Sequence, residues 1–442
     1  MKSNSFFLIS LGCAKNTVDS DSMAALLVRG GYEVVDRASK ASLLIVNTCG
    51  FIQSARAESI EVLQQLSQRK KSGQLLVAAG CMTERYRNQI LEAVEGVDGF
   101  IGTRRWMEIL DFVRELRPDR IGPRYPIPES TSVDQGEGNV IRATVQGASA
   151  YLKIADGCRR PCAFCSIPLI KGTTVSRPVD VILKDAEALQ SSGIQELILI
   201  AQDTTDYGVD LGMQNGLAEL LEILLPRIPD IPWVRILYSF PGYVTDRLIE
   251  VIGASRQILP YLDIPLQHAN PDTLKRMKRP ADMDWVYRTI EKMRKAMPEL
   301  AIRTTFIVGY PGETDQEFDV LLNFMREIKF DHVGVFPFSF EIGTSSESLG
   351  DPISESVKGA RLGELMRLQQ GISLKKNQTW IGKRMDVLIE GQGDGISVGR
   401  TFRDAPEIDG LVLVEKEIEV GRIVPVMINS ALAHDLTGTS ID

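Results

Sequence analysis

The sequence predicts an α/β protein in which two parallel α/β regions precede a small all-β module. Three observations support this fold class. Short apolar runs alternate with amphipathic helical stretches over residues 5–115, the same alternation resumes near residue 141, and β-rich runs with glycine turns follow residue 377. Alternating strands and helices are typical of parallel sheets, whereas short strands without helices between them are typical of small β-barrels.

The N-terminal region, residues 5–116, contains three short apolar runs that we interpret as strands buried on both faces. These runs are residues 6–10, 43–47 and 75–79. Helical patterns lie between them, at residues 21–29 and 54–69. The next segment, 117–140, is rich in Pro, Gly, Ser and charged residues and is predicted to be a linker.

The central region, residues 141–376, carries six candidate strands separated by helical patterns. The strands are residues 151–155, 196–201, 233–238, 261–264, 303–308 and 332–336. Six successive strand–helix units favour a parallel barrel, complete or partial. A flat doubly wound sheet would give the same pattern and remains an alternative. A long polar helix ends the region, and residues 377–442 are predicted to form a small β-barrel.

Composition excludes several classes of protein. No apolar run approaches the roughly 20 residues needed to span a bilayer, and the apolar run at the N-terminus is too short for a signal peptide. The net charge is −8, so broad binding to phosphate backbones is not expected. Six cysteines without an export signal indicate a reducing compartment, where thiols serve metals or catalysis. We therefore expect a cytoplasmic protein.

Three cysteines lie within eight residues, in the run Cys158-Arg-Arg-Pro-Cys162-Ala-Phe-Cys165. Three thiolates on one short loop can converge on a single inorganic centre. Zinc needs a fourth ligand, and the nearest histidine along the chain is His268, for which a structural role is the default expectation. Ferredoxin-type clusters use a fourth cysteine, which is also missing. Three cysteines on a four-iron cluster would leave one iron open.

The other three cysteines form a second pattern. Cys13, Cys49 and Cys81 each lie at or just beyond the carboxyl end of a predicted strand. Ligands of open parallel sheets bind at this edge, so three thiols delivered there should face a common point. A disulfide would leave one cysteine over, and simple burial does not explain the shared position. We therefore predict a second three-cysteine cluster.

The C-x3-C-x2-C loop resembles the signature of the radical S-adenosylmethionine superfamily. The resemblance implies a [4Fe-4S] cluster on Cys158, Cys162 and Cys165, whose open iron binds S-adenosylmethionine and whose electron cleaves it to a 5′-deoxyadenosyl radical. It also implies a partial (β/α)6 barrel. By the same resemblance, residues at the starts or the ends of the predicted strands approach the cofactor, although ordinary strand boundaries and a tight turn would explain these positions equally. These residues are Glu196, Gln202, Ser239, Arg303 and Gly309.

The chain has two three-cysteine sites followed by a small β-module, and in this order of parts it resembles the methylthiotransferases over nearly its whole length. This resemblance implies a second [4Fe-4S] cluster, on Cys13, Cys49 and Cys81, that supplies or carries sulfur. It further implies that S-adenosylmethionine serves both as methyl donor and as radical source, that an electron-donor protein is needed, and that the C-terminal module is a TRAM-like β-barrel.

Two branches of that family differ in substrate. The motif Leu11-Gly12-Cys13-Ala14-Lys15-Asn16 and the stretch Phe338–Thr344 (FSFEIGT) resemble the branch that modifies the β-carbon of an aspartate in ribosomal protein S12, free or in the small subunit. Residues 377–442 contain six Lys and Arg against eleven Asp and Glu, and an acidic module suits a basic partner better than RNA. Direct nucleic-acid binding is therefore not expected. The alternatives are methylthiolation of adenosine in transfer RNA and a non-catalytic iron–sulfur scaffold.

Overall fold

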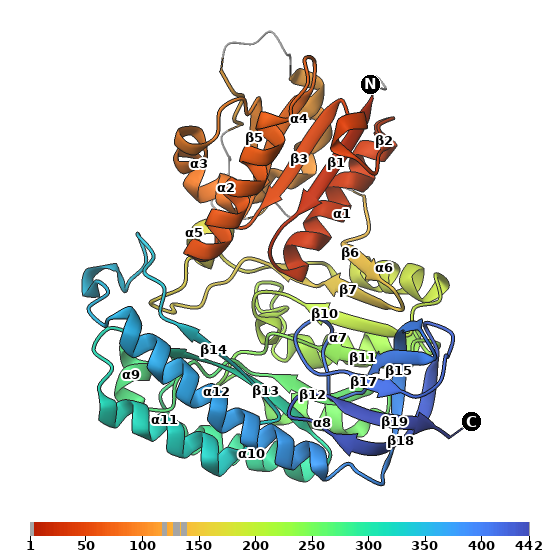
Figure 1. The fold of residues 1–442 in the computed structure, drawn as a ribbon, viewed down its shortest axis with the longest axis vertical. Helices are drawn as coiled ribbons and strands as arrows, with labels where there is room; N and C mark the ends of the chain where they lie inside the picture. The colour runs from red at the N-terminus through yellow and green to blue at the C-terminus, as the bar shows by residue number, and fades with distance from the viewer. Residues whose placement is uncertain (1–3, 117–121, 127–132, 134–138, 442) are drawn as a thin grey trace. The chain divides into compact units, whose positions relative to one another are not determined.

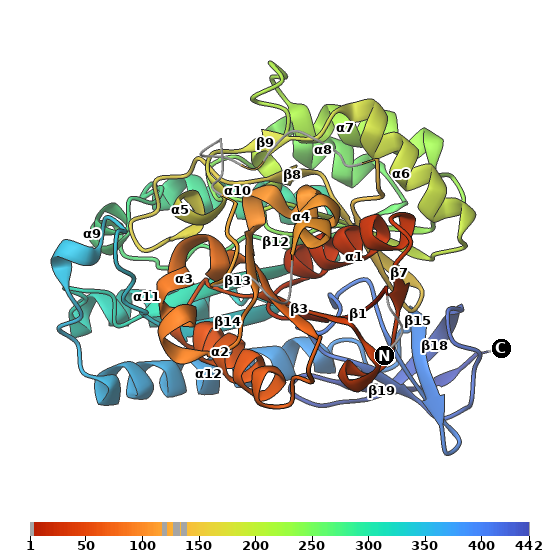
Figure 2. The ribbon, with the colours of Figure 1, turned by 90° about the horizontal axis from the view of Figure 1, so that it is seen from above.

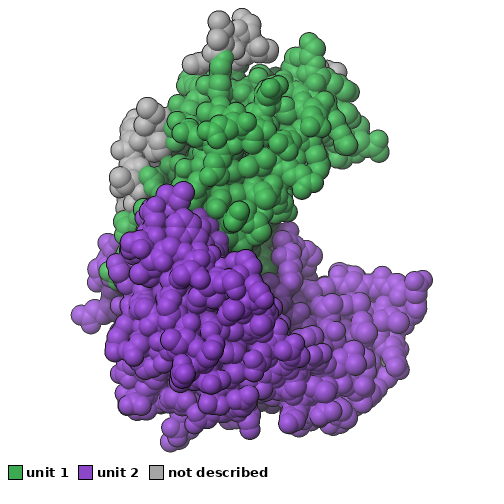
Figure 3. All heavy atoms as spheres, turned by 60° about the vertical axis from the view of Figure 1, so that its left-hand side comes forward, with its two compact units in different colours: residues 1–144, 151–160, 165–177 green, residues 145–150, 161–164, 178–442 purple. Residues whose placement is uncertain are grey.

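A computed structural model describes residues 4–116, 122–126, 133 and 139–441 of the chain (Figure 1). It divides into two compact units, which Figure 3 colours separately. The first unit comprises Met1–Thr144, Tyr151–Arg160 and Cys165–Arg177. The second unit comprises Val145–Ala150, Pro161–Phe164 and Pro178–Asp442. The predicted linker 117–140 falls largely outside the described residues.

The first unit contains a five-stranded parallel sheet in the order β2-β1-β3-β4-β5. Its strands are β1 (Ser5–Ser10), β2 (Glu33–Val34), β3 (Leu43–Thr48), β4 (Leu75–Gly80) and β5 (Gly99–Gly102). Its main helices are α1 (Ala14–Arg29), α2 (Gln53–Gln68), α3 (Cys81–Ala93) and α4 (Ile109–Glu115). All three strands predicted for this region are present, and they are neighbours in the sheet.

Both faces of this sheet are covered. Alternate residues of each strand point to opposite faces, so Ile45 packs in one apolar core with residues of α1 and α4, such as Leu27. Its neighbour Val46 packs in the other core with residues of α2 and α3, including Leu63 and Ile90. Burial on both faces explains why these strands are continuous apolar runs in the sequence.

A seven-stranded sheet has the order β14-β13-β12-β11-β10-β7-β6. The strands are β6 (Ala143–Gln146), β7 (Ser149–Lys153), β10 (Glu196–Ile200), β11 (Trp233–Ile236), β12 (Ile258–Asp263), β13 (Ala301–Val308) and β14 (His332–Pro337). From β10 to β14 the strands are parallel and follow the order of the chain. A doubly wound sheet reverses its order at a switch point, whereas this sheet does not. The arrangement is therefore a partial barrel, the first of the two predicted alternatives.

Helices alternate with these strands. They are α6 (Val179–Ser191), α7 (Gly216–Leu224), α8 (Asp246–Ala254), α9 (Pro271–Arg276), α10 (Met283–Ala296) and α11 (Asp315–Ile328), followed by α12 (Glu355–Gln378), which packs against α11, β13 and β14 (Figure 1). Capping side chains near their N-termini determine where two of these helices begin. The Thr314 hydroxyl and the Glu317 carboxylate form a capping box at the start of α11. The Asn270 side chain caps α9, whose first residue is proline.

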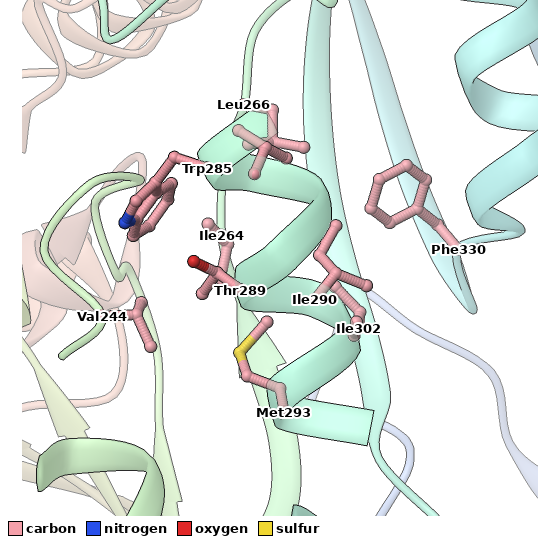
Figure 4. A pocket seen from close by; sticks show the side chains of 10 residues that line it. Val244, Ile264, Leu266, Trp285, Thr289, Ile290, Met293, Ile302 and Phe330 are labelled. Carbon is pink, nitrogen blue, oxygen red and sulfur yellow. The ribbon is translucent and has the colours of Figure 1, made fainter. Parts of the chain in front are cut away.

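The apolar face of α10 packs on the sheet without a large void. Trp285, Thr289, Ile290 and Met293 of α10 line a pocket of about 10 Å³ together with Ile302 of β13 (Figure 4). A space of this size, lined almost wholly by apolar groups, is a packing defect of the core. We assign no binding role to it.

The C-terminal module is a closed five-stranded barrel in the order β15-β16-β17-β19-β18. Its strands are β15 (Arg384–Gly393), β16 (Ile396–Arg400), β17 (Val412–Val414), β18 (Ile423–Ala431) and β19 (Leu436–Ser440), and Figure 2 shows them gathered near the C-terminus. Alternate residues, for example Val424 and Val426, fill its interior. The predicted fold class is confirmed. None of the helices in the described part of the chain is both long and apolar enough to cross a membrane.

Candidate metal and cofactor sites

The N-terminal cysteines lie at one edge of the first sheet. Cys13 is the N-cap of α1, three residues after β1 ends, and Cys81 is the first residue of α3, directly after β4. Cys49 directly follows β3. Because β1, β3 and β4 are adjacent and parallel, their carboxyl ends deliver all three thiols to the same edge.

Two glycines bring the three cysteine-bearing turns into contact. Gly12 has φ of +90°, and a Cβ added there would lie 2.8 Å from the Cβ and 2.9 Å from the Sγ of Cys49. A Cβ on Gly50 would lie 2.7 Å from the Cα of Met82, the residue after Cys81. Side chains at these positions would push the turns apart. The glycines therefore permit the close approach of the three turns.

A buried hydrogen-bond network fixes the same edge. The Asn16 amide donates to Leu11 O at 2.6 Å and to Asn47 O at 3.2 Å, and the Asn47 amide donates to Asn16 O at 2.9 Å and to Ser20 Oγ at 2.8 Å. These bonds tie the start of α1 to the end of β3. Asn47 was missed by sequence reasoning, although its place at the end of a buried strand, where a polar residue needs a partner, was a signal.

The three thiols differ electrostatically. Burial raises the pKa of the Cys81 thiol to about 12 and also raises that of Cys49. Cys13 is an exposed residue, and the partial desolvation of its thiol is outweighed by Lys15, Lys171 and nearby backbone N–H groups, so the pKa of this thiol is lowered. Within the described residues no three Cys, His, Asp or Glu side chains are gathered closely enough for a single metal ion. Thiols at three neighbouring strand ends instead suit a larger centre, such as a four-iron cluster.

The stem of the second cysteine loop is tightly closed. The short strands β8 (Ala155–Asp156) and β9 (Val175–Ser176) pair antiparallel, and the N–H of Cys158 donates to Gly172 O at 3.0 Å. Gly157 has φ of +73°, and a Cβ there would lie 1.9 Å from Thr173 O. The short helix α5 (Ile167–Lys171) begins two residues after Cys165. The loop is therefore held at its base.

In the second unit, Cys162 contacts an arginine that sequence reasoning missed. Arg279 Nη1 donates to Cys162 Sγ at 3.4 Å, and Arg279 is only 8% exposed. The neighbouring Ala163 is fixed by backbone bonds, since its N–H donates to Met277 O at 2.9 Å and its carbonyl accepts from Ser346 N at 2.9 Å. The contact with Arg279 fixes the position of the Cys162 side chain within the loop. Nothing in the local sequence around Arg279 signalled this contact.

Polar atoms without partners lie at the carboxyl ends of the core strands. The Oε1 of Gln202, after β10, the Oγ of Ser239, after β11, and the Oε1 of Gln267, after β12, are buried and form no hydrogen bond within the described residues. Two non-glycine residues at this edge have positive φ, Tyr238 at +62° and Gln267 at +74°. Unpaired polar atoms and backbone strain are typical of ligand sites. The predicted residues Gln202 and Ser239 therefore share one sheet edge and fit a polar cofactor.

Gly309 also belongs to this edge, one residue after β13. Its φ is +72°, and a Cβ there would lie 2.3 Å from Lys358 Cγ. Its N–H donates to the Glu313 carboxylate, which also contacts His268 Nε2 at 3.0 Å and Arg361 at 2.7 Å. His268 is fully buried, and its Nδ1 accepts from Asn270 N at 3.0 Å, so both ring nitrogens are used. The default expectation of a structural histidine holds.

The structure places Glu196 and Arg303 at the opposite edge. Glu196 begins β10 and is fully buried; Arg235 Nε donates to its Oε1 at 2.7 Å, and Arg400 Nη2 donates to its Oε2 at 2.6 Å. Arg303, near the start of β13, donates to Asp409 at 2.7 Å. Both residues join the core sheet to the C-terminal barrel. Their contact with a cofactor stays a prediction, and their position does not support it.

Comparison with known proteins defines the class. A family model described as "Radical SAM superfamily" matches residues 152–325, one described as "TRAM domain" matches residues 381–441, and one described as "Uncharacterized protein family UPF0004" matches residues 5–102. A solved structure of the radical S-adenosylmethionine methyltransferase TsrM from Kitasatospora setae is similar in fold, with a TM-score of 0.57 and 13% identity over 78% of this chain and 74% of that one. The chain is a radical S-adenosylmethionine enzyme.

Curated relatives narrow the family. A protein of Chloroflexus aurantiacus is 45% identical over 99% of both chains, and one of Synechocystis is 43% identical over 98% of this chain and 96% of the relative. Both are named ribosomal protein uS12 methylthiotransferase RimO. The chain belongs to this family of radical S-adenosylmethionine methylthiotransferases.

Proposed function

We propose that this chain methylthiolates the β-carbon of an aspartate in ribosomal protein S12, with S-adenosylmethionine as both methyl donor and radical source. The relatives named for this activity match the chain over nearly its whole length. The observation that carries the proposal is the delivery of three cysteines to one edge of the first sheet, in addition to the cysteine loop of the radical enzymes. The second set of thiols distinguishes sulfur insertion from radical chemistry alone.

The proposal divides the work among three regions. Residues 5–116 hold a [4Fe-4S] cluster on Cys13, Cys49 and Cys81, and residues 141–376 hold a second one on Cys158, Cys162 and Cys165. The chemistry that the second cluster supplies when bound is one-electron reductive cleavage of S-adenosylmethionine. Residues 377–442 contact the substrate protein. The chain acts in the cytoplasm with a separate electron-donor protein.

The chain's own residues have distinct tasks around these centres. Arg279 orients the side chain of Cys162 through their direct contact. Gln202 and Ser239 offer buried oxygens to the polar groups of S-adenosylmethionine, and Gly309 allows its backbone to approach closely. Apolar side chains around the loop, such as Phe164 beside Tyr310 and Phe338, exclude water, which protects a radical from quenching.

The substrate assignment rests on names and on charge. The curated relatives carry the name of a protein-modifying enzyme, and the exposed charges of the C-terminal barrel are predominantly acidic. Modification of transfer RNA is not favoured by either observation. Free S12 and S12 in the small subunit expose different parts of the S12 surface. Both forms can be tested as substrates in parallel.

The test is intact-mass analysis of ribosomal proteins from cells that lack this chain. We expect S12 to lose the mass of one methylthio group in place of hydrogen, and re-expression of the wild-type chain to restore it. The Cys162→Ala variant should not restore it and should form no 5′-deoxyadenosine. If all ribosomal protein masses are unchanged while a transfer RNA loses a methylthio group, the RNA alternative is correct.

A second experiment tests the clusters. After anaerobic reconstitution we expect about eight irons per chain, and about four after replacement of Cys13, Cys49 and Cys81 by alanine. About four irons in the unmodified chain would contradict the N-terminal cluster. Retention of 5′-deoxyadenosine formation by the N-terminal triple variant would separate radical generation from sulfur transfer.

A further inference from the structure

Five ionisable side chains form a buried cluster in the first unit, and none of them is more than 5% exposed. They are Asp19, Arg142, Lys153, Asp156 and Lys171. Arg142 Nη2 lies 2.6 Å from Asp19 Oδ1 and 3.1 Å from Asp156 Oδ2, and Lys153 contacts the same two carboxylates. Lys171 Nζ lies 3.0 Å from Asp19 Oδ2 and 3.1 Å from Asp156 Oδ1. Each of the three cations therefore contacts both carboxylates.

The three cations and two carboxylates of the cluster sum to a charge of +1 when all five groups are ionised. Burial lowers the pKa of Lys153 to about 8, so this lysine is still charged at pH 7. Burial also opposes the charge of Lys171, but Asp156 and Asp19 outweigh it and raise its pKa. Lys153 and Lys171 are therefore both cationic at neutral pH.

The cluster joins the bases of both cysteine-bearing loops. Asp19 lies on α1, the helix that Cys13 caps, and Asp156 lies two residues before Cys158. Lys171 is the last residue of α5, and Gly172 after it accepts the bond from Cys158 N. The ammonium of Lys171 thus connects a residue close to each set of cysteines.

Helix α5 also packs against the elements that carry the N-terminal cysteines. It packs against α3, which begins at Cys81, and the hydroxyl of its N-cap Ser166 lies 3.5 Å from Phe51 O in the turn after Cys49. Lys171, at the end of α5, is bound to Asp19 of α1, the helix that Cys13 caps. The positive charge at the end of α5 therefore lies among the elements that carry the N-terminal set.

We propose that Lys171 is a positioning residue shared by both sets of cysteines, and that its charge raises the reduction potential of a four-iron cluster on Cys13, Cys49 and Cys81. The inference rests on the N-terminal cluster of the proposed function. Reduction adds an electron to a centre whose thiolate ligands are already anionic, so a nearby cation stabilises the reduced form. Asp19 and Asp156 hold the ammonium in place and screen part of its charge.

The test uses the full-length chain with Cys158, Cys162 and Cys165 replaced by alanine, so that only the N-terminal cluster is present. After anaerobic reconstitution, the cluster is titrated with dithionite at pH 7 and followed by electron paramagnetic resonance. We expect Lys171→Met to shift the midpoint to lower potential at unchanged iron content, and Lys171→Arg to restore most of the shift, since it keeps the charge.

The matched control is Lys70→Met. Lys70 is a partly buried lysine of the same unit, 2.5 Å from Asp98 near the start of β4, whereas Cys81 follows the end of that strand. Its loss should leave the midpoint unchanged. An unchanged midpoint in Lys171→Met with full iron overturns the inference, whereas failure of the parent variant to bind iron contradicts the N-terminal cluster itself.

A second variant provides the test if Lys171→Met does not fold. If Lys171→Met does not accumulate as folded protein, Asp19→Asn is titrated in its place. This variant removes a negative charge from the same cluster, so the midpoint should rise. A midpoint equal to that of the parent, or below it, overturns the inference.

Discussion

Gly12 combines a left-handed backbone with close contact to Cys49, and a single methyl group tests both constraints. In Gly12→Ala the new Cβ would meet the Cβ and Sγ of Cys49 below 3 Å. We expect the iron content to fall from about eight to about four per chain, since the N-terminal thiols can no longer converge. Gly31→Ala is the control, because Gly31 has nearly the same φ, +87°, and no atom within 4 Å of the added Cβ. Equal iron loss in both variants would assign the effect to backbone strain alone.

Glu196 is a second residue whose role can be measured, from the pH dependence of the free energy of unfolding. Burial would raise its pKa, but Arg235 and Arg400 hold it at about 2, below the ordinary 4.5. A carboxyl whose pKa is depressed by folding stabilises the protein above pH 4.5 and loses that effect as the pH falls toward 2. The difference corresponds to about 3 kcal/mol at neutral pH. Urea unfolding of the metal-free protein should show that Glu196→Gln destabilises strongly at pH 7 and progressively less below pH 4.5.

The control for this measurement is Glu390→Gln. Glu390 also contacts Arg400, at 2.7 Å, but its side chain is 31% exposed. Partly exposed pairs contribute about 1 kcal/mol or less, so this variant should change stability little at any pH. A pH-independent difference between wild type and Glu196→Gln would mean that the lost packing, and not the ionised carboxylate, is responsible.

At the scale of elements, the sequence predicted strands and helices well because periodicity is local. Both ends of α2 lie within one residue of the predicted helix 54–69, and β14 extends the predicted strand 332–336 by one residue. What the sequence could not decide was partial barrel against doubly wound sheet, because strand order depends on contacts distant in the chain. Glu196 and Arg303 were assigned to the cofactor by resemblance alone. Both open the strands predicted at 196–201 and 303–308, and in the structure their places near the starts of β10 and β13 put them at the edge opposite Gln202 and Ser239.

The segment after β14 exposes apolar side chains near the edge that carries Ser239 and Gln267. Phe340 is 37% exposed and Ile342 is 60% exposed. Exposed apolar groups beside a site commonly contact the substrate. We expect Phe340→Ser combined with Ile342→Ser to raise the KM for S12 about tenfold, a loss of about 1.4 kcal/mol in binding, without changing 5′-deoxyadenosine formation in the absence of S12.

An exposed apolar residue elsewhere gives the control for that prediction. Val320 on α11 is 40% exposed, and Val320→Ser should leave the KM unchanged. If the double variant also loses 5′-deoxyadenosine formation without substrate, the segment shapes the cofactor site instead of contacting S12.

At the scale of the molecule, the sequence predicted the net charge of the C-terminal module but not how the charges are distributed over its surface. The sequence shows an excess of acidic residues after residue 377 but not which of them face solvent. In the structure Arg400 and Arg403 are buried, as are Asp404 and the side chain of Asp409. Among the described residues of this module, seven acidic and four basic residues are exposed. Folding therefore buries charge of both signs and leaves the surface of the barrel acidic.

This surface should set the affinity for a basic substrate protein. Glu415, Glu417 and Glu419 are exposed together in the segment between β17 and β18. Replacing all three by Lys should raise the Kd for isolated S12 about tenfold or more at low salt, and by less at 0.5 M salt, because ions screen charges over about 10 Å or less. The control replaces three other exposed acidic residues by Lys: Glu291, Glu299 and Asp319, on or next to α10 and α11. This variant makes the same change in net charge at another surface, so the Kd should change little. Binding is measured by fluorescence anisotropy of labelled S12. Equal weakening by both triple variants would assign the effect to net charge, whereas no change in the first would remove the barrel from substrate binding.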